Sequence, residues 1–113
     1  MSKAEIQEII NCLKSIDPIK IILFGSHAAQ TAHKDSDVDL YVVTADDYIP
    51  DTYKEKLDLK CRISELLDPV RQTYPVDLLV HTFPMYREFI RLNSAFSREI
   101  LNHGVVLHEA DYA

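Results

Sequence analysis

Alternating helical and strand spacings of apolar residues divide the chain into predicted helices and strands. Ser2 and Glu5 have the spacing of a capping box, and apolar residues at helical spacing follow them. The Asp17-Pro18 pair is predicted to end this first helix, because proline disfavours helical backbone at the residue before it. The β-rich run over residues 19–24 then predicts a short buried strand.

After this strand, Gly25-Ser26 is predicted to turn the chain into a short helix over the alanines at 28–32. The remaining short elements follow from the same patterns. They are strands over residues 37–44, 75–82 and 105–107, and helices over residues 84–92 and 94–103. Strands that alternate with helices indicate one small α/β domain over residues 1–113, with helices packed on a mixed β-sheet.

A longer helix is predicted to open at Pro50 or Asp51 and to stop at Asp68-Pro69. Its apolar residues recur at helical spacing and are expected to face inward. They are Tyr53, Leu57, Leu59, Ile63, Leu66 and Leu67.

The chain contains only two glycines, so each is expected to mark a backbone position where a side chain is not tolerated. Gly104 lies between the helix over 94–103 and the strand over 105–107, which is typical of a glycine that ends a helix. Gly25 ends the first predicted strand and is the candidate for a functional role.

The charge balance and the cysteines limit the classes of function. Eighteen acidic residues against twelve lysines and arginines argue against direct binding of nucleic-acid phosphates. No apolar run reaches the roughly 18 residues that a membrane span needs, and the charged first ten residues are not typical of a signal peptide. Cys12 and Cys61 lack CxxC spacing and are interpreted as reduced thiols, so a cytoplasmic domain is expected.

Two aspartates lie two residues apart in the second predicted strand. Residues at this spacing point to the same face of a strand, roughly 7 Å apart at Cα, so Asp37 and Asp39 are expected to project side by side. Carboxylates held together beside a core remain ionised most readily when a cation lies between them. The alternative is a solvated start of a strand.

The third predicted strand also contains a carboxylate, Asp77, which is flanked by apolar residues. If the second and third strands are neighbours, Asp37, Asp39 and Asp77 can converge. A set of hard oxygen ligands with open positions suits Mg²⁺, or Mn²⁺, completed by water and substrate phosphates.

Gly25-Ser26 is a candidate phosphate-binding turn. A glycine between a strand and a helix lets backbone amides approach an anion closely, and Ser26 adds a hydroxyl. No G-K-[ST] sequence follows, so the turn is not a Walker A loop. Ser36 is a further candidate for contact with a nucleotide, although a serine that caps a turn is an equally good interpretation.

Gly25-Ser26, the Asp37-x-Asp39 pair ten residues further on and the later Asp77 resemble the nucleotidyltransferase superfamily that includes DNA polymerase β. The block LFGSHAAQTAHKDSDVDLYVV is similar to the signature of its minimal nucleotidyltransferase branch, and VDLLV is similar to the strand of the third carboxylate. The closing segment ILNHGVVLHE also resembles the end of that domain, so the likeness covers nearly the whole chain.

The resemblance implies a polymerase β palm-like fold and transfer of a nucleoside monophosphate from an NTP, most simply AMP from ATP, to a hydroxyl. It implies that Asp37 and Asp39 hold two divalent ions, and that Asp77 binds the ion nearest the acceptor and helps to deprotonate the attacking hydroxyl. Gly25 and Ser26 would bind the β- and γ-phosphates.

The small helix that follows the Gly-Ser pair in the family commonly contains an arginine and a glycine. Ala29 and Gln30 occupy those places here, with His27 and His33 nearby. Loss of the basic group is expected to weaken NTP binding, and loss of the glycine to alter the turn.

The acceptor is expected to belong to another chain, because 113 residues leave no room for a separate acceptor domain. The minimal branch is similar to antitoxins that are paired with a small helical HEPN protein and transfer AMP to it. Two alternatives remain open: a binding module that neutralises its partner by contact alone, and a homo-oligomeric transferase that acts on a small molecule.

Overall fold

A mixed four-stranded β-sheet in the order β3-β2-β1-β4 forms the centre of the protein in a computed structural model that describes residues 1–33 and 36–111. Its strands are β1 (Lys20–Phe24), β2 (Val38–Val43), β3 (Val76–His81) and β4 (Val105–Glu109). β1 runs antiparallel to both β2 and β4, whereas β2 and β3 are parallel. The predicted mixed sheet and α/β class are therefore confirmed.

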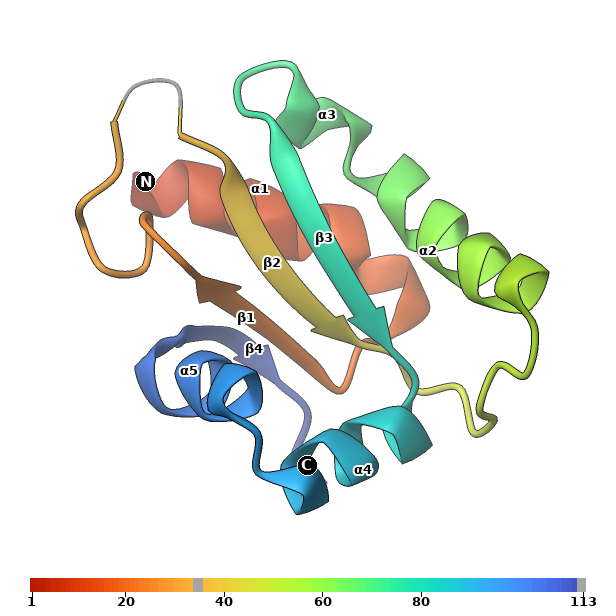
Figure 1. The fold of residues 1–113 in the computed structure, drawn as a ribbon. Helices are drawn as coiled ribbons and strands as arrows, with labels where there is room; N and C mark the ends of the chain where they lie inside the picture. The colour runs from red at the N-terminus through yellow and green to blue at the C-terminus, as the bar shows by residue number, and fades with distance from the viewer. Residues whose placement is uncertain (34–35, 112–113) are drawn as a thin grey trace.

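Helices cover both faces of this sheet (Figure 1). They are α1 (Lys3–Leu13), which continues into a short 3₁₀ turn η1 (Lys14–Ile16), α2 (Tyr53–Leu66), α3 (Asp68–Arg71), α4 (Phe83–Leu92) and α5 (Ala95–His103). The first three α-helices pack on one face, and α4 and α5 pack on the other. Within the described residues, none of these helices combines the length and apolar character that crossing a membrane requires.

The sequence signals for the ends of α1 are borne out by the backbone. The Ser2 hydroxyl accepts a hydrogen bond from the Glu5 amide at 3.1 Å, and the Glu5 carboxylate accepts one from the Ser2 amide at 2.9 Å. Asp17 adopts a left-handed conformation with φ of 48° and ends η1. This end leads directly into β1 and fixes where the first strand enters the sheet.

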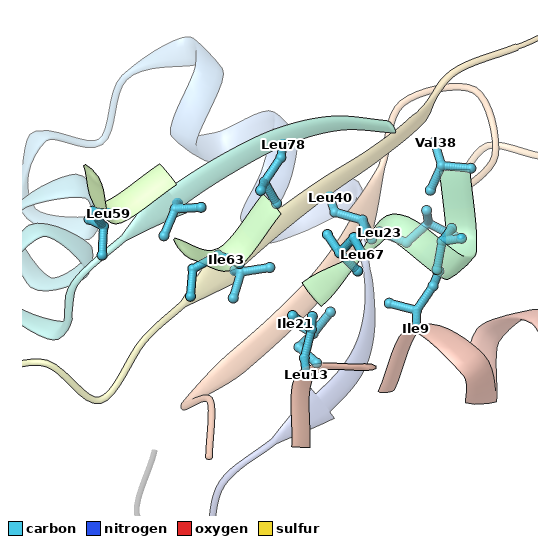
Figure 2. Packing of buried hydrophobic residues seen from close by; sticks show 13 residues of the cluster. Ile9, Leu13, Ile21, Leu23, Val38, Leu40, Leu59, Ile63, Leu67 and Leu78 are labelled. Atoms are coloured by element: carbon cyan, nitrogen blue, oxygen red, sulfur yellow. The ribbon is translucent and has the colours of Figure 1, made fainter. Parts of the chain in front are cut away.

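The larger of two apolar cores lies between the sheet and helices α1 to α3, and Figure 2 shows how its side chains interdigitate. Alternate residues of the strands point into it. They are Ile21 and Leu23 of β1, Val38, Leu40 and Val42 of β2, and Leu78 and Val80 of β3. The intervening residues face α4 and α5 and form a second core that is rich in aromatic rings.

The segment after β1 differs from its prediction, because residues 25–30 form consecutive turns and not a short helix. The Ala29 amide donates to the Gly25 carbonyl at 3.1 Å, but the Thr31 amide donates to the Ser26 carbonyl, one residue further back than in an α-helix. Gln30 has φ of 59°, a left-handed conformation that stops helical propagation.

The long helix also differs in detail from its prediction. α2 begins at Tyr53 because Thr52 caps it, with its hydroxyl accepting from the Glu55 amide at 3.1 Å. Tyr53 and Leu57 are 79% and 44% exposed, so the inward-facing prediction is wrong for both. The other residues of that set lie inside, with Leu59, Ile63 and Leu67 buried and Leu66 packed against the core.

α2 ends at Leu66, just before Asp68-Pro69 as predicted, and the same pair opens the short helix α3. Proline is compatible with the first turn of a helix, where its missing N–H has no intrahelical partner. α3 then leads the chain back to the start of β3.

Gly104 ends α5, and both the helix over 95–103 and the following strand agree with their predictions. Its backbone is extended, with φ of −71°. The need for glycine is steric, because a Cβ would overlap the Ile100 carbonyl oxygen and the Ile22 side chain. The prediction that a side chain is not tolerated at this position is confirmed.

Candidate active site

The parallel pairing of β2 and β3 places two aspartates next to each other. Asp39 and Asp77 are register partners across the two strands, and Phe24 at the end of β1 is the partner of Asp39 on the other side. Three strand ends therefore contribute to one row across the sheet, named here the acidic row: Phe24, Asp39 and Asp77. The sequence predicted this adjacency only on the condition that the second and third strands are neighbours in the sheet.

Alternation along β2 sets the face on which the carboxylates lie. Val38 and Leu40 point into the core beneath α1 to α3, so Asp39 shares the opposite face with buried Tyr41. Asp37 lies two residues before Asp39 at the entrance to the strand. Asp37 and Asp77 are exposed, whereas Asp39 is partly buried. The carboxylates thus lie at the end of the sheet where β2 and β3 begin (Figure 1).

Asp39 is the electrostatically crowded member of this group. Partial burial raises its pKa, and the negative charges of Asp77 and Asp37 raise it further. The imidazole of His27 acts in the opposite direction and lowers the pKa of Asp39. The fold therefore concentrates anionic charge here, in a position that a cation would stabilise.

Gly25 makes room for the Asp39 carboxylate. A Cβ at residue 25 would overlap Asp39 Oδ2, and the backbone φ of 73° is left-handed. Two independent constraints thus require glycine, one steric and one conformational. The prediction that no side chain is tolerated is confirmed, and the structure adds a reason that the sequence does not contain: Gly25 is in contact with the acidic row.

The turn after Gly25 corrects the picture of a phosphate-binding helix N-terminus. Because residues 25–30 are turns, no helix dipole is available there, and an anion would meet individual amide groups. Gln30 retains left-handed backbone at the place where a glycine is common in the resembling family. Ala29 is exposed, so the position of the missing arginine faces solvent.

His27 is the residue of this region that the sequence did not single out. Its Nε2 lies 3.2 Å from the Ser36 carbonyl oxygen, and its ring packs edge-on against Tyr74 with centroids 5.3 Å apart. His27 thereby connects the turn to the segment before Asp37. Its place two residues after Gly25 is the only sequence signal for this role, since histidine there has no ligand spacing.

Ser36 shapes the segment that leads into β2. Its hydroxyl accepts a hydrogen bond from the His33 amide at 2.8 Å, and its own amide donates to the His33 carbonyl at 3.0 Å. These contacts are those of a turn-capping serine, the second of the two interpretations of Ser36. Residues 34–35, between these partners, lie outside the described residues.

The carboxylates match the chemistry of a divalent-ion site but do not form a closed one. Across residues 1–33 and 36–111, no three acidic, histidine or cysteine side chains converge closely enough to hold a metal ion as they stand. Like-charged carboxylates repel one another without a cation between them. Their hard oxygen atoms nevertheless suit Mg²⁺, which uses few protein carboxylates and keeps positions for water and phosphate, and a bound cation would offset the repulsion of Asp39 by Asp77 and Asp37.

Comparisons with known proteins agree with this architecture. Two solved structures resemble the chain in fold: a toxin–antitoxin crystal structure with AMP-PNP, at 24% identity and a TM-score of 0.58, and a mutant of the toxin–antitoxin MntA-HpeT, at 22% and 0.55. Each match covers 95% of this chain and 75% of the other. Among curated proteins, no sequence matches significantly. The family model described as polymerase beta, nucleotidyltransferase, matches residues 7–113, so the chain belongs to the polymerase β-like nucleotidyltransferase family.

Proposed function

We propose that the protein transfers a nucleoside monophosphate, AMP from ATP, to a hydroxyl of a partner polypeptide, as the antitoxin of a toxin–antitoxin pair. The observation that carries the proposal is the register pairing of Asp39 with Asp77 beside Gly25, with Asp37 two residues away. Membership of the family supports the reaction type. The fold likeness to toxin–antitoxin structures, one with AMP-PNP, supports the nucleotide and the kind of partner, for which a small helical HEPN protein is the candidate.

In this reaction the acceptor oxygen attacks the α-phosphorus of ATP. A new P–O bond forms to the acceptor, the bond between the α-phosphorus and the α,β-bridging oxygen breaks, and pyrophosphate leaves. The hydroxyl proton passes to a base, for which exposed Asp77 is the candidate, because its partner strand brings it next to Asp39. Asp39 is partly buried and is crowded by the charges of Asp77 and Asp37, so it is the central ligand candidate.

Asp37, Asp39 and Asp77 would hold one or two Mg²⁺ ions, with Mn²⁺ as a substitute. When bound, the ions supply charge neutralisation for the triphosphate and lower the pKa of the attacking hydroxyl. Three carboxylates would otherwise repel ATP, so nucleotide binding is expected to depend on the divalent ion. The turn amides after Gly25, with the Ser26 hydroxyl, are the candidate contacts for the β- and γ-phosphates.

The experiment combines the purified protein with α-labelled ATP, Mg²⁺ and the product of the neighbouring gene. Label is expected on the partner, and Asp37→Asn or Asp77→Asn is expected to reduce it about 100-fold or more. Asp47→Asn is the matched control, because Asp47 is an exposed acid in the loop after β2. Absence of label with the unmodified protein, or equal label with Asp77→Asn, would contradict the proposal.

A second function is favoured by one observation, the exposed Ala29 at the place of the family's arginine. With no basic group there, the protein would neutralise its partner by contact alone. Inhibition of the partner that persists unchanged in Asp37→Asn and Asp77→Asn would establish this function in place of transfer.

A further inference from the structure

β3 lies at one edge of the sheet, and no other strand of the described residues pairs with its outer side. Pro75 and His81 direct their carbonyl oxygens to β2, where they accept from Val38 and Thr44 at 2.8 and 2.9 Å. Because residues of a strand alternate in the side to which their peptide groups point, the even-numbered residues 76, 78 and 80 direct theirs outward. Within the described residues, no hydrogen bond satisfies these outward groups.

The opposite edge of the sheet is less suited to pairing. The register of β4 with β1 shifts between Ile21 and Ile22, which marks a bulge, whereas all six residues of β3 pair with β2 without interruption. Bulges twist an edge away from further strand addition. The regular edge is therefore the outer side of β3.

Two cavities flank this edge, one toward each helical layer. The cavity on the α2 side has a volume of about 200 Å³, and the cavity on the α4 side about 210 Å³. The first is lined by Lys56, Leu59 and Lys60 together with β3 residues, the second by Ile49, Met85, Glu88, Phe89 and Leu92. His81 and Met85 line both cavities, so the two lie on either side of these side chains at the end of β3. An extended strand placed along the edge would direct alternate side chains into each cavity.

The residues that line the two cavities indicate which side chains an occupant would carry. Lys56 and Lys60 are exposed, lie one helical turn apart on α2, and make no ion pair with any described residue. In a chain of net charge −6, they form a local basic surface suited to a carboxylate. On the α4 side, Ile49 and Leu92 are 57% and 63% exposed and are suited to large apolar side chains.

We propose that an extended segment of the partner polypeptide adds to β3 as a fifth strand. It carries apolar side chains toward Ile49 and Leu92 and an aspartate or glutamate toward Lys56 and Lys60. Main-chain hydrogen bonds to residues 76, 78 and 80 supply affinity, and the two cavities supply sequence preference.

The same docking mode would present the acceptor, a step that rests on the proposed function. Directly opposite residues of adjacent strands have Cβ atoms about 5 Å apart on the same face. A serine, threonine or tyrosine opposite Asp77 would therefore direct its hydroxyl to the acidic row. The substrate class is thus a hydroxyl on an extended polypeptide segment and not a free small molecule.

Amide hydrogen exchange, followed by NMR on the labelled chain with and without the unlabelled product of the neighbouring gene, tests the docking mode. The amides of Val76, Leu78 and Val80 are expected to exchange at least about 10-fold more slowly in its presence, because they gain acceptors. The amides of Leu79 and His81 point to β2 and serve as internal controls. No slowing at the three outward amides overturns the proposal, whether or not label is transferred. Slowing in the chain alone at rising concentration assigns the edge to a second copy and also overturns it.

A charge-reversed variant, Lys56→Glu with Lys60→Glu, gives a second test that leaves the acidic row unchanged. Its affinity for the partner is expected to fall about 10-fold or more, with ATP binding unaltered. Lys3→Glu with Lys14→Glu is the matched control, because these two exposed lysines lie on α1 and η1. Equal affinity in both double variants overturns the assigned charge of the occupant. Protection of the edge without transfer of label would contradict the proposed function and leave the docking mode in place.

Discussion

Gly25 and Gln30 begin and end the turn that follows β1, and both have left-handed backbone. Gly25 satisfies this conformation without strain and leaves space for the Asp39 carboxylate. Gln30 has a Cβ, which costs about 1–2 kcal/mol in left-handed backbone. The turn is therefore formed with one residue in a conformation that glycine would adopt more easily.

Gln30→Gly is expected to stabilise the fold by about 0.5–1 kcal/mol, because relief of the left-handed strain exceeds the entropy that glycine adds to the unfolded chain. Urea unfolding measures the difference. Gln30→Ala is the control, since it retains the Cβ and should give no gain of this size. If Gln30→Gly is less stable than the unmodified protein, the exposed Gln30 side chain stabilises the fold by more than its left-handed backbone costs.

At the scale of elements, His81 at the end of β3 joins the sheet to α4. Its Nδ1 shares a hydrogen bond of 2.7 Å with the Tyr41 hydroxyl, and its ring packs edge-on against Phe89 with centroids 5.0 Å apart. Burial lowers the pKa of His81. Protonation in the folded state is therefore resisted, whereas the unfolded chain takes up the proton readily.

The sign of the resulting pH dependence follows from linkage. Since the folded pKa of His81 lies below the unfolded value of 6.5, the unfolded state binds more protons, and stability is lost as the pH falls through that value. The loss is expected to stay below about 1.4 kcal/mol per pH unit, the limit for one proton. Urea unfolding between pH 7 and pH 5 measures it.

His81→Asn is expected to flatten this slope, while His103→Asn, at an exposed position, should leave it unchanged. The charged groups that line the cavities beside the ring, Glu88 on α4 and Lys56 and Lys60 on α2, are exposed and are common to both variants. Equal slopes for the two variants would show that His81 is not the titrating group.

The sequence predicted those elements whose signal is local. The strand over 76–81 and the capped helix α1 follow from runs of apolar residues and from a capping box, and both lie where expected. The alanines of 28–32 have high helix propensity, but the left-handed Gln30 ends any helix there. The pairing of Asp39 with Asp77 depends on strand order and register, which no local pattern contains.

For the whole molecule, the proposed metal site at the acidic row predicts that stability depends on divalent ions. The pKa of Asp39 is raised by burial and by its carboxylate neighbours, so its ionised form destabilises the metal-free fold at neutral pH. A ligand that binds only the folded state and offsets this repulsion shifts the unfolding equilibrium by mass action. The net charge of −6 adds a weaker and less specific response to any salt.

Mg²⁺ at ten times its dissociation constant is expected to stabilise the protein by about 1.4 kcal/mol and to raise Tm by about 4 °C or more. Asp39→Asn is expected to have a higher metal-free Tm, since the repulsion is relieved, and to lose the response to Mg²⁺. Thermal unfolding with NaCl at matched ionic strength separates binding from screening. If Mg²⁺ raises the Tm of the unmodified protein and of Asp39→Asn by the same amount, the ions only screen surface charge.

The acidic row also sets the stage of synthesis at which the proposed site can form. Its residues come from three strands, and Asp77 follows Asp39 only after the whole crossover through α2 and α3. A nascent polypeptide that has emerged only as far as β2 contains the glycine turn, Asp37 and Asp39 but lacks Asp77. The proposed site therefore forms together with the β2–β3 pairing, and local opening of that pairing would separate Asp39 from Asp77 before the main core is lost.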